Sequence, residues 1–590
     1  MLKSIKNLGA IGIISDTDPR SLPENAFTTG NNVRFVDNDI EKSKGESEVF
    51  TTPAIDPYWL LPVQTESVYY WVYPSLTECY VTDGTTNTPI TRVEASKSVT
   101  GITRSGTTAT ATTGAAHGYS NGDIISHEGA DQADYNITAT ISNITANTYD
   151  YTVANSPTTP ATGTILAYKN TLYAATADIG WNGGNIGNVP IINNGVDDPQ
   201  MWNPVGTGTK LTSLTWASGQ TWATQSKTAR VIRPFQQALI AMDCTESGTR
   251  YRQRIRWSHP ADSGAVPSTW DETDTTKDAG YYDLEAGGGN VVDGLPLRDT
   301  FIIYKDNKTI GMQRIGGAAV YRFYDIFEET GILSRRCVKA FFGKHFVVTN
   351  GDVIVHDGNT FDSVINHRKK KELFALIDAT NYQRTFVSPN YQKNEMWICF
   401  PKTGSSFADT AYIWNFKDDT WTVRDLPTVK HIGYGLVDPN EADTWASTTD
   451  TWDLVEGSWG ELSYSPTIIK NLMAGSTKFY LADDTEQTDG SNITAYVERD
   501  GLDFGNASHV KRITRVWPRI ECSGDITFYV GQQMVSTDAV TWTAYTYSSG
   551  DDKIDVDVTG RLLGYRIESN TNVSWSAQDL DFEYTVRGRY

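Results

Sequence analysis

The chain has 590 residues, 39% hydrophobic and 21% charged, which is enough apolar sequence to bury several cores and excludes disorder along its whole length. Its net charge of −21 disfavours nucleic-acid binding through a broad basic face, because an acidic surface repels phosphate. Abundant Trp, Tyr, Gly and Thr, without long Ala/Leu/Glu/Lys stretches, favour strands and turns over helix bundles.

Residues 1–100 carry short strand patterns that we expect to join a propeller-like domain. Val33-Arg-Phe-Val36 alternates before an Asp37-Asn38 turn, which predicts a hairpin over 31–50, and further short strands are expected around 58–93. The apolar run near the start is short and acidic residues follow it at once. We therefore expect neither a signal peptide nor, anywhere in the chain, a membrane span.

Residues 101–167 differ in composition, since Thr, Ala, Ser and Gly dominate. Apolar residues alternate with Thr, as in Tyr149-Asp-Tyr-Thr-Val153. A low-complexity linker is the alternative, but a linker has no reason to keep a period of two. The range is therefore predicted to be a small β-domain inserted into its host.

Residues 168–490 contain repeated short strands bounded by turns, a pattern typical of a β-propeller. Phe346-Val-Val-Thr349 is followed by Asn350-Gly351, which predicts a type I′ hairpin, and Asp357-Gly358 gives a second such signal. The repeats are degenerate, so the number of blades is left open. A series of β-sandwiches is the structural alternative.

The last two predicted elements are a helix and a terminal domain. A short helix is expected at about 368–379, where apolar residues recur at helical spacing. Across 491–590 the strands alternate cleanly, as in Ile526-Thr-Phe-Tyr-Val530, which predicts a β-sandwich. The expected fold class is thus all-β: a degenerate propeller-like domain with a small inserted β-domain and a C-terminal β-sandwich.

The sequence gives no clear sign of catalytic chemistry. The motifs G-x-x-x-x-G-K-[ST], G-x-S-x-G and H-E-x-x-H are absent, and we expect no catalytic residue, no cofactor, no bound metal and no enzyme activity. The five cysteines are spread without a CxxC pair, which favours buried reduced thiols and folding in a reducing cytoplasm. His345 and His356 flank one predicted hairpin. Ordinary strand-end histidines are favoured over a metal pair, since no third ligand stands out.

The run Arg368-Lys-Lys-Lys371 is the one dense basic stretch that we identify in this acidic chain. Cations at a helix N-terminus oppose the helix dipole, and that local conflict raises the prospect of a partner. A solvated helix start is the plain alternative. We predict Arg368, Lys369, Lys370 and Lys371 as contacts to DNA in a channel or to an acidic neighbouring subunit.

Several stretches of the sequence together carry a family resemblance. They are Leu22-Pro-Glu-Asn-Ala-Phe-Thr-Thr-Gly-Asn-Asn-Val-Arg-Phe35, Arg256-Trp-Ser-His-Pro-Ala-Asp262, Ala411-Tyr-Ile-Trp-Asn-Phe-Lys-Asp-Asp-Thr-Trp421 and the ending Val586-Arg-Gly-Arg589. They resemble virion structural proteins of short-tailed bacteriophages, the tail nozzle or tail tubular protein B-like family. The inserted segment, with His117-Gly118 and Ala161-Thr-Gly-Thr-Ile165, is similar to a small β-module common in phage tail proteins. The likeness covers most of the chain, but its motifs are structural and transfer no catalytic residue.

The resemblance implies a homo-hexameric ring below the portal and adaptor proteins. Such a ring encloses the DNA channel, retains the packaged genome, lets DNA pass without sequence preference, and carries tail fibres or the needle. The protein would then belong to the virion tail, assembled in the host bacterial cytoplasm.

Two other functions stay open. One is a receptor-binding or adhesive tail protein that recognises bacterial surface glycans, for which a trimeric, fibrous form with long repeats is expected. The other is a carbohydrate-active propeller enzyme, which needs two carboxylates converging in a central pocket.

Overall fold

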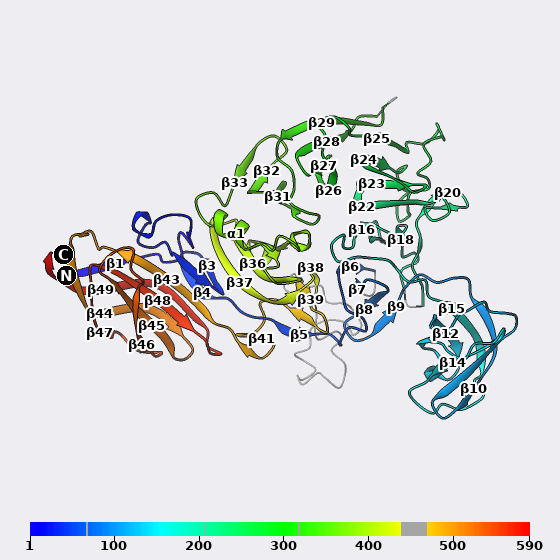
Figure 1. The fold of residues 1–590 in the computed structure, drawn as a ribbon, viewed down its shortest axis with the longest axis horizontal. Helices are drawn as coiled ribbons and strands as arrows, with labels where there is room; N and C mark the ends of the chain where they lie inside the picture. The colour runs from blue at the N-terminus through cyan, green and yellow to red at the C-terminus, as the bar shows by residue number, and fades with distance from the viewer. Residues whose placement is uncertain (66–68, 207, 317–318, 438–468, 590) are drawn as a thin grey trace, which may run out of the picture.

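The computed structural model describes residues 1–65, 69–206, 208–316, 319–437 and 469–589. Three β-rich bodies follow one another along the long axis: a β-sandwich that holds both termini, a β-propeller, and a smaller β-body (Figure 1). The predicted all-β fold class is confirmed, and the described residues contain a single α-helix, α1 (Lys370–Leu376). Short 3-10 helices lie at Pro19–Ser21, Ala133–Tyr135, Tyr382–Arg384 and Tyr391–Lys393.

The propeller is built from seven four-stranded antiparallel sheets, or blades, within the described part of the chain. They stand around a central axis, which Figure 1 shows nearly end-on. The innermost strands lie side by side from blade 2 to blade 7, and that of blade 7 lies beside that of blade 1. A middle strand that neighbouring blades pack on both faces is buried along its whole length, as Glu395–Phe400 is.

The strands of each blade follow in order from the inside outward. Blade 1 comprises β6 (Leu61–Gln64), β7 (Tyr69–Pro74), β8 (Cys79–Thr82) and β9 (Asn87–Pro89). Blade 2 comprises β16 (Asn182–Ile186), β17 (Val189–Asn193), β18 (Gln200–Met201) and β19 (Thr212–Ser213). Blade 3 comprises β22 (Lys227–Phe235), β23 (Ala238–Glu246), β24 (Thr249–Trp257) and β25 (Gly280–Asp283). Blade 4 comprises β26 (Val291–Leu297), β27 (Thr300–Lys305), β28 (Lys308–Arg314) and β29 (Tyr321–Glu328). Blade 5 comprises β30 (Val338–Phe341), β31 (Lys344–Val348), β32 (Val353–His356) and β33 (Phe361–Ser363). Blade 6 comprises β34 (Phe386–Asn390), β35 (Glu395–Phe400), β36 (Ala408–Asn415) and β37 (Thr420–Val429). Blade 7 comprises β38 (His431–Leu436), β39 (Ile469–Ala474), β40 (Phe479–Leu481) and β5 (Ser47–Val49).

The ring closes through strands from distant parts of the sequence. The outermost strand of blade 7 is β5, which precedes blade 1 in the chain. Between blades 7 and 1, the indole of Trp71 packs beside Gly433 and donates from Nε1 to the carbonyl of Leu436 at 2.8 Å. Small hairpins outside the blades are β20 (Thr215–Ala217) with β21 (Gln220–Thr221), and β41 (Gln487–Thr488) with β42 (Ser491–Asn492).

The smaller β-body leaves the propeller between blades 1 and 2. Alternation of Ala and Thr along one strand buries Ala109 and Ala111 and turns Thr108 outward, as a period of two requires. Its aromatic core includes Tyr149 and Tyr151. In spatial order its strands are β13 (Thr138–Thr140), β12 (Ile124–Ala130), β15 (Gly163–Lys169), β10 (Lys97–Ser105), β11 (Thr108–Thr113) and β14 (Thr148–Thr152).

The sandwich packs two sheets over one apolar core. Its alternation is regular in Ile554–Gly560, where every second residue is buried. One sheet contains β1 (Leu2–Ile5), β3 (Val33–Val36), β4 (Asp39–Lys42), β49 (Trp575–Arg589), β44 (His509–Cys522) and β47 (Ile554–Gly560). The other contains β2 (Thr29–Asn31), β43 (Ala495–Leu502), β48 (Leu562–Ser569), β45 (Ile526–Gln533) and β46 (Thr541–Tyr547).

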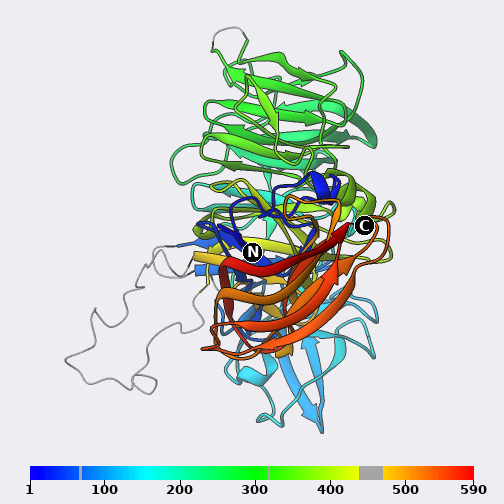
Figure 2. The ribbon, with the colours of Figure 1, turned by 90° about the vertical axis from the view of Figure 1, so that its left-hand side faces the viewer.

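The pairing corrects one expectation, because the first four strands complete the sandwich and do not join the propeller. β1 and β4 pair with β49, and β2 pairs with β43. The reason is that the C-terminal strands leave two sheet edges that the N-terminal strands cover. Viewed from the sandwich, blades 3 to 5 rise above it and the smaller β-body lies below (Figure 2).

The predicted hairpin after Phe346 forms, but its turn differs from the expected type. β31 pairs with β32 across Asn350-Gly351, yet neither of these two residues has a positive φ, so the type I′ prediction is wrong. β32 pairs with β33 across residues 357–360, where the Asp357 carboxylate accepts hydrogen bonds from the Asn359 and Thr360 amides.

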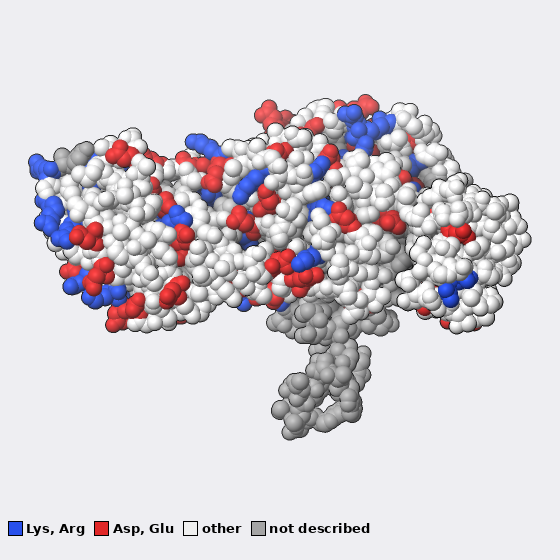
Figure 3. All heavy atoms as spheres, turned by 60° about the horizontal axis from the view of Figure 1, so that its bottom comes forward, with Lys and Arg blue, Asp and Glu red and all other residues white. Residues whose placement is uncertain are grey.

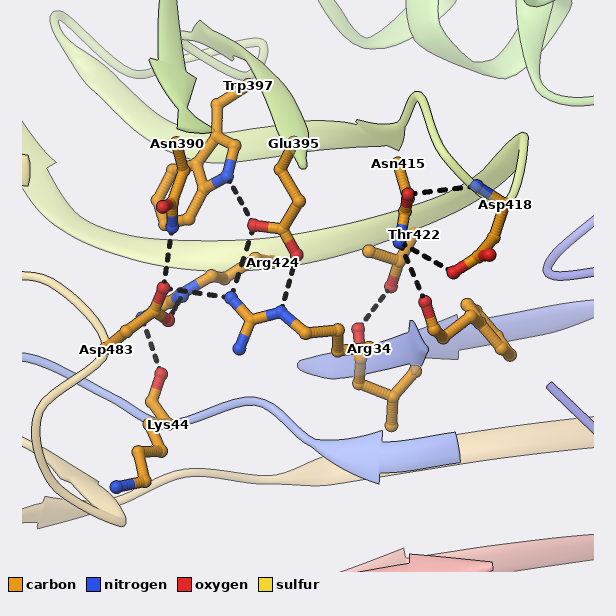
Figure 4. A network of polar contacts seen from close by, with 12 residues as sticks. Arg34, Lys44, Asn390, Glu395, Trp397, Asn415, Asp418, Thr422, Arg424 and Asp483 are labelled. Carbon is orange, nitrogen blue, oxygen red and sulfur yellow. Dashed lines mark hydrogen bonds and ion pairs between the residues drawn. The ribbon is translucent and has the colours of Figure 1, made fainter. Parts of the chain in front are cut away.

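A buried polar network joins the sandwich to the propeller (Figure 4). Arg34 on β3 contacts Glu395 on β35 and Asp483, which follows β40. Arg424 on β37 reaches the same Asp483 and also Glu46, each at 2.5 Å. Burial alone would raise the pKa of Asp483, but Arg34 and Arg424 hold it well below its ordinary value. The two bodies are thus held together by charges that cannot separate without being left unpaired.

No helix among the described residues is long and apolar enough to cross a membrane.

Candidate functional site

The basic run leads into α1, which begins two residues later and ends earlier than predicted. Arg368 pairs with Asp419, with 2.6 Å between Nη2 and Oδ2. Lys369 is 1% exposed, and its Nζ lies 2.6 Å from Glu372 Oε2. Burial lowers the pKa of Lys369, and Glu372 acts against this shift. A buried ammonium has no surface to offer to a partner, which corrects the expectation for Lys369.

Lys370 and Lys371 keep surface exposure. Lys370 Nζ lies 2.9 Å from Asp352 Oδ2. Lys371 is exposed and its side chain forms no ion pair with a described residue, while its backbone amide donates to Asp16 Oδ2 at 3.0 Å. Asp16 thus supplies the anion that the helix N-terminus favours. Contact to DNA or to an acidic neighbour stays a prediction for Arg368, Lys370 and Lys371.

A second basic pattern lies on β24, where four arginines take alternate positions. Our expectation of a single dense basic stretch is therefore wrong, because it counted only consecutive cations. The period of two is the signal that could have found them, since alternate residues of a strand point to one side of the sheet. The four are Arg250, Arg252, Arg254 and Arg256.

The inner pair of this row is structural. Arg254 lies 2.7 Å from Asp283, and Arg256 lies 2.7 Å from Glu272. Both also contact Glu246. Their charges are therefore balanced within blade 3.

The outer pair, Arg250 and Arg252, borders an open pocket of about 480 Å³. This pocket lies on the face where the innermost strands of blades 3 and 4 begin. We call it the arginine pocket and define it by Arg230, Arg250, Arg252 and Arg335. Arg252 is exposed at the rim, whereas Arg230 and Arg335 are half-buried.

Asp243 is an acid built into the wall of the arginine pocket. It lies on β23 at the bulge where the register with β24 shifts, has a φ of +55° and is 1% exposed. A bulge re-aims a side chain, and here it delivers the carboxylate to Arg250, at 2.8 Å from Nε and 2.5 Å from Nη2. Arg250 is thereby neutralised.

The other acids of the pocket are also engaged. Asp178 accepts from Arg384 Nε at 2.8 Å, and Asp306 accepts from the Asn290 amide at 3.1 Å.

Three arginines of the pocket consequently have no carboxylate partner among the described residues: Arg230, Arg252 and Arg335. Burial, helped by the neighbouring Arg250, lowers the pKa of Arg230. Burial likewise lowers the pKa of Arg335, whose Nε has no hydrogen-bond partner among the described residues. An excess of unpaired guanidinium groups in an open pocket favours the binding of anions.

The propeller axis holds a separate central cavity of about 410 Å³, lined by the innermost strands of all seven blades in the described chain. Apolar residues form most of its wall, and Arg233, Arg336, Lys339 and His431 also face it. The adjacent residues Arg335 and Arg336 thus line different spaces, the first the arginine pocket and the second this cavity.

His345 and His356 lie directly opposite each other on β31 and β32. The hydroxyl of Tyr304 sits between them, 2.7 Å from His345 Nδ1 and 2.6 Å from His356 Nε2. Because His345 Nε2 lies 2.9 Å from the carbonyl of Pro296 and must donate to it, His345 Nδ1 accepts from Tyr304. Burial lowers the pKa of His345 to about 4 and that of His356 to about 3, so both imidazoles are neutral. Among the described residues, no three His, Cys, Asp or Glu side chains are placed to hold a metal ion.

No protein-family model matches the chain, and no curated protein matches it in sequence. Three solved structures are distantly similar to the chain. The phage phi92 endosialidase is 12% identical with a TM-score of 0.17, covering 59% of this chain and 52% of its own. An exo-β-1,3-galactanase from Phanerochaete chrysosporium is 7% identical with a TM-score of 0.21, covering 92% and 100%. A sialidase of Trypanosoma rangeli is 8% identical with a TM-score of 0.22, covering 91% and 96%. The chain thus spans about half the length of the phage endosialidase.

These comparisons contradict the expectation that the chain is not an enzyme, because all three solved structures are enzymes by their names, and we withdraw it. The TM-scores are too low to transfer an activity or a site. The propeller itself rests on the strand pairing described above.

Proposed function

We propose that this chain is a structural subunit of the tail nozzle of a short-tailed bacteriophage. In this role it forms a homo-hexameric ring in the virion tail, contacts the adaptor, lines part of the DNA exit channel, helps to retain the genome and carries tail fibres or the needle. The observation that carries the proposal is the rigid joint between two large β-bodies through Arg34, Glu395, Asp483 and Arg424. A ring under the load of a packaged genome requires subunits whose parts keep a fixed orientation.

The size of the central cavity supports a DNA channel that lies outside the propeller. A cavity of about 410 Å³ has the volume of a small-molecule site. The major groove of B-DNA alone is about 12 Å wide, so a duplex cannot thread one propeller. In a nozzle the channel therefore runs between subunits, along their outer faces.

The outer surface suits such a channel. Lys/Arg and Asp/Glu side chains are interspersed on the face in Figure 3, without a broad basic area. A net charge of −21 also keeps phosphate from adhering to the wall. The resemblance of the quoted sequence stretches to nozzle proteins points the same way, although no family model or curated sequence matches the chain.

Oligomeric state tests the proposal most directly. Mass photometry of the purified chain and cryo-electron microscopy of virions that carry it should show a six-fold ring on the tail axis with DNA in its lumen. A peripheral trimer, or a chain absent from virions, would contradict the nozzle role.

The arginine pocket favours a second candidate function, the recognition of acidic bacterial surface glycans by a tail protein. Its unpaired Arg230, Arg252 and Arg335 suit the carboxylates of a uronic or sialic acid polymer. Biolayer interferometry with polygalacturonate and with neutral dextran should then show binding only to the former. Arg252→Met should weaken that binding at least fivefold, and equal binding of both polymers would argue against this function.

A further inference from the structure

Arg336 combines three features that seldom occur together. It is 9% exposed, its φ is +67°, and its Nε and Nη1 atoms have no hydrogen-bond partner among the described residues. A left-handed backbone is strained for a residue with a side chain, and a buried unpaired guanidinium is costly. Both costs fall on one residue that lines the central cavity.

The nearest carboxylate cannot relieve Arg336. Asp293 is fully buried and accepts from Arg233 Nε at 3.0 Å and Nη2 at 2.9 Å. It also accepts from the backbone amides of Arg336 at 3.0 Å and Gly294 at 2.8 Å. These four hydrogen bonds use the acceptor sites of the carboxylate, so the Arg336 side chain is left without an anion.

A second cation faces the same space. Lys339 is half-buried, and its side chain forms no hydrogen bond or ion pair with a described residue. Burial lowers its pKa to about 8, and Arg233 and Arg336 add to the shift. His431 is buried and neutral, because burial and these same cations lower its pKa well below the usual range. With the Arg233 charge balanced by Asp293, two positive charges remain uncompensated.

We propose that the central cavity binds a small organic anion, a carboxylate or a phosphate ester with an apolar body, through Arg336 and Lys339. An anionic group would satisfy both cations at once. The cavity volume of about 410 Å³ is in the range of small-ligand sites. The rest of the wall, including Trp59, Leu295 and Ile432, offers apolar contact to the body of such a ligand. This inference is independent of the nozzle role, since it concerns the interior of a single propeller.

Isothermal titration of the full chain tests the proposal with two probes, inorganic phosphate and benzoate. Saturable binding of benzoate in preference to phosphate identifies the carboxylate class, and the reverse preference identifies phosphate esters. Arg336→Met and Lys339→Met keep the apolar stem of each side chain, and each should weaken the binding of the preferred probe at least tenfold. Arg512→Met, on the sandwich surface and outside both pockets, is the control and should leave the affinity within twofold of the parent chain.

Two results would overturn the proposal: no saturable binding of either probe, or equal affinity in the Arg336 and Lys339 variants and the parent chain. Circular dichroism checks that the variants fold. Should Arg336→Met fail to fold, the half-buried Lys339→Met variant decides the question alone.

Discussion

Arg34 and Glu395 form a buried ion pair across 361 residues of sequence, with 2.5 Å between Nε and Oε1 and 3.2 Å between Nη2 and Oε2. Their side chains are 6% and 1% exposed. Arg34 stands on a sandwich strand and Glu395 on a middle strand of blade 6, so this pair links the two largest bodies. A second carboxylate, Asp483, lies 2.9 Å from the same guanidinium.

Replacing Arg34 with Met should destabilise this joint. The change leaves the carboxylates of Glu395 and Asp483 buried without their shared cation, which typically costs about 3–5 kcal/mol. Urea denaturation should show the lower stability, and limited proteolysis should release the sandwich from the propeller. Arg512→Met removes the more exposed pair with Asp557 and serves as the control, because exposed ion pairs contribute little to stability. Equal effects of the two variants would show that the Arg34 pair does not hold the joint.

The closure of the ring should be sensitive to a single methyl group at Gly433. A Cβ there would lie 2.6 Å from Cζ3 of Trp71, an indole that is 2% exposed. Gly433→Ala should therefore cost about 1–3 kcal/mol of unfolding free energy, the usual effect of overpacking. Denaturant unfolding measures this directly. Gly101→Ala is the control, because a Cβ there meets nothing within 4 Å. A stability of Gly433→Ala equal to that of the control would mean that Trp71 can shift freely.

The sequence allowed the fold class to be predicted because alternation and turn chemistry are local properties. Ile554, Val556 and Val558 show this, since burial follows their period of two without reference to any partner. The partner of a strand is not a local property. Nothing within Val33–Val36 indicates that this strand joins the sheet of β49, through β4, and not blade 1. This is why the first strands were assigned to the wrong body.

The candidate sites, too, could be predicted only where the signal is local in the sequence. The consecutive cations at 368–371 are conspicuous in sequence, yet Lys369 is buried and paired. Arg336 has no sequence signal, because its importance depends on Asp293 being already saturated by Arg233. Such an excess of charge becomes visible only when the partners of every neighbouring group are known.

Substitutions in the basic run should differ in their effect on stability, because Lys369 is buried and Lys370 and Lys371 are not. Lys369→Ala removes a buried cation and leaves Glu372 without its partner, so we expect a loss of about 1–3 kcal/mol. Lys370→Ala and Lys371→Ala should change stability by about 0.5 kcal/mol or less. Thermal unfolding separates the two classes.

The same exposed pair tests the predicted partner contact. Virions that carry Lys370→Ala together with Lys371→Ala should assemble poorly or lose their genome, although the isolated chain folds normally. Normal virion yield and infectivity in this double variant would rule out a contact to DNA or to a neighbouring subunit through these lysines.

Acid should destabilise the fold through its buried histidines. Burial lowers the pKa of His127 and His345 to about 4 and that of His356 to about 3. As the pH falls below about 6.5, the unfolded chain takes up protons on these imidazoles while the folded chain does not. Stability present above pH 6.5 is therefore lost as the pH falls, by about 1.4 kcal/mol per pH unit for each such histidine.

Urea denaturation between pH 6.5 and 5 measures this dependence of stability on pH, above the range where most carboxylates titrate. His356→Gln should reduce the slope of stability against pH by the contribution of one histidine. The matched control is His367→Gln, which replaces an exposed histidine. A flat profile for the parent chain, or an unchanged slope in His356→Gln, would show that these imidazoles take up protons in the folded state as easily as in the unfolded one.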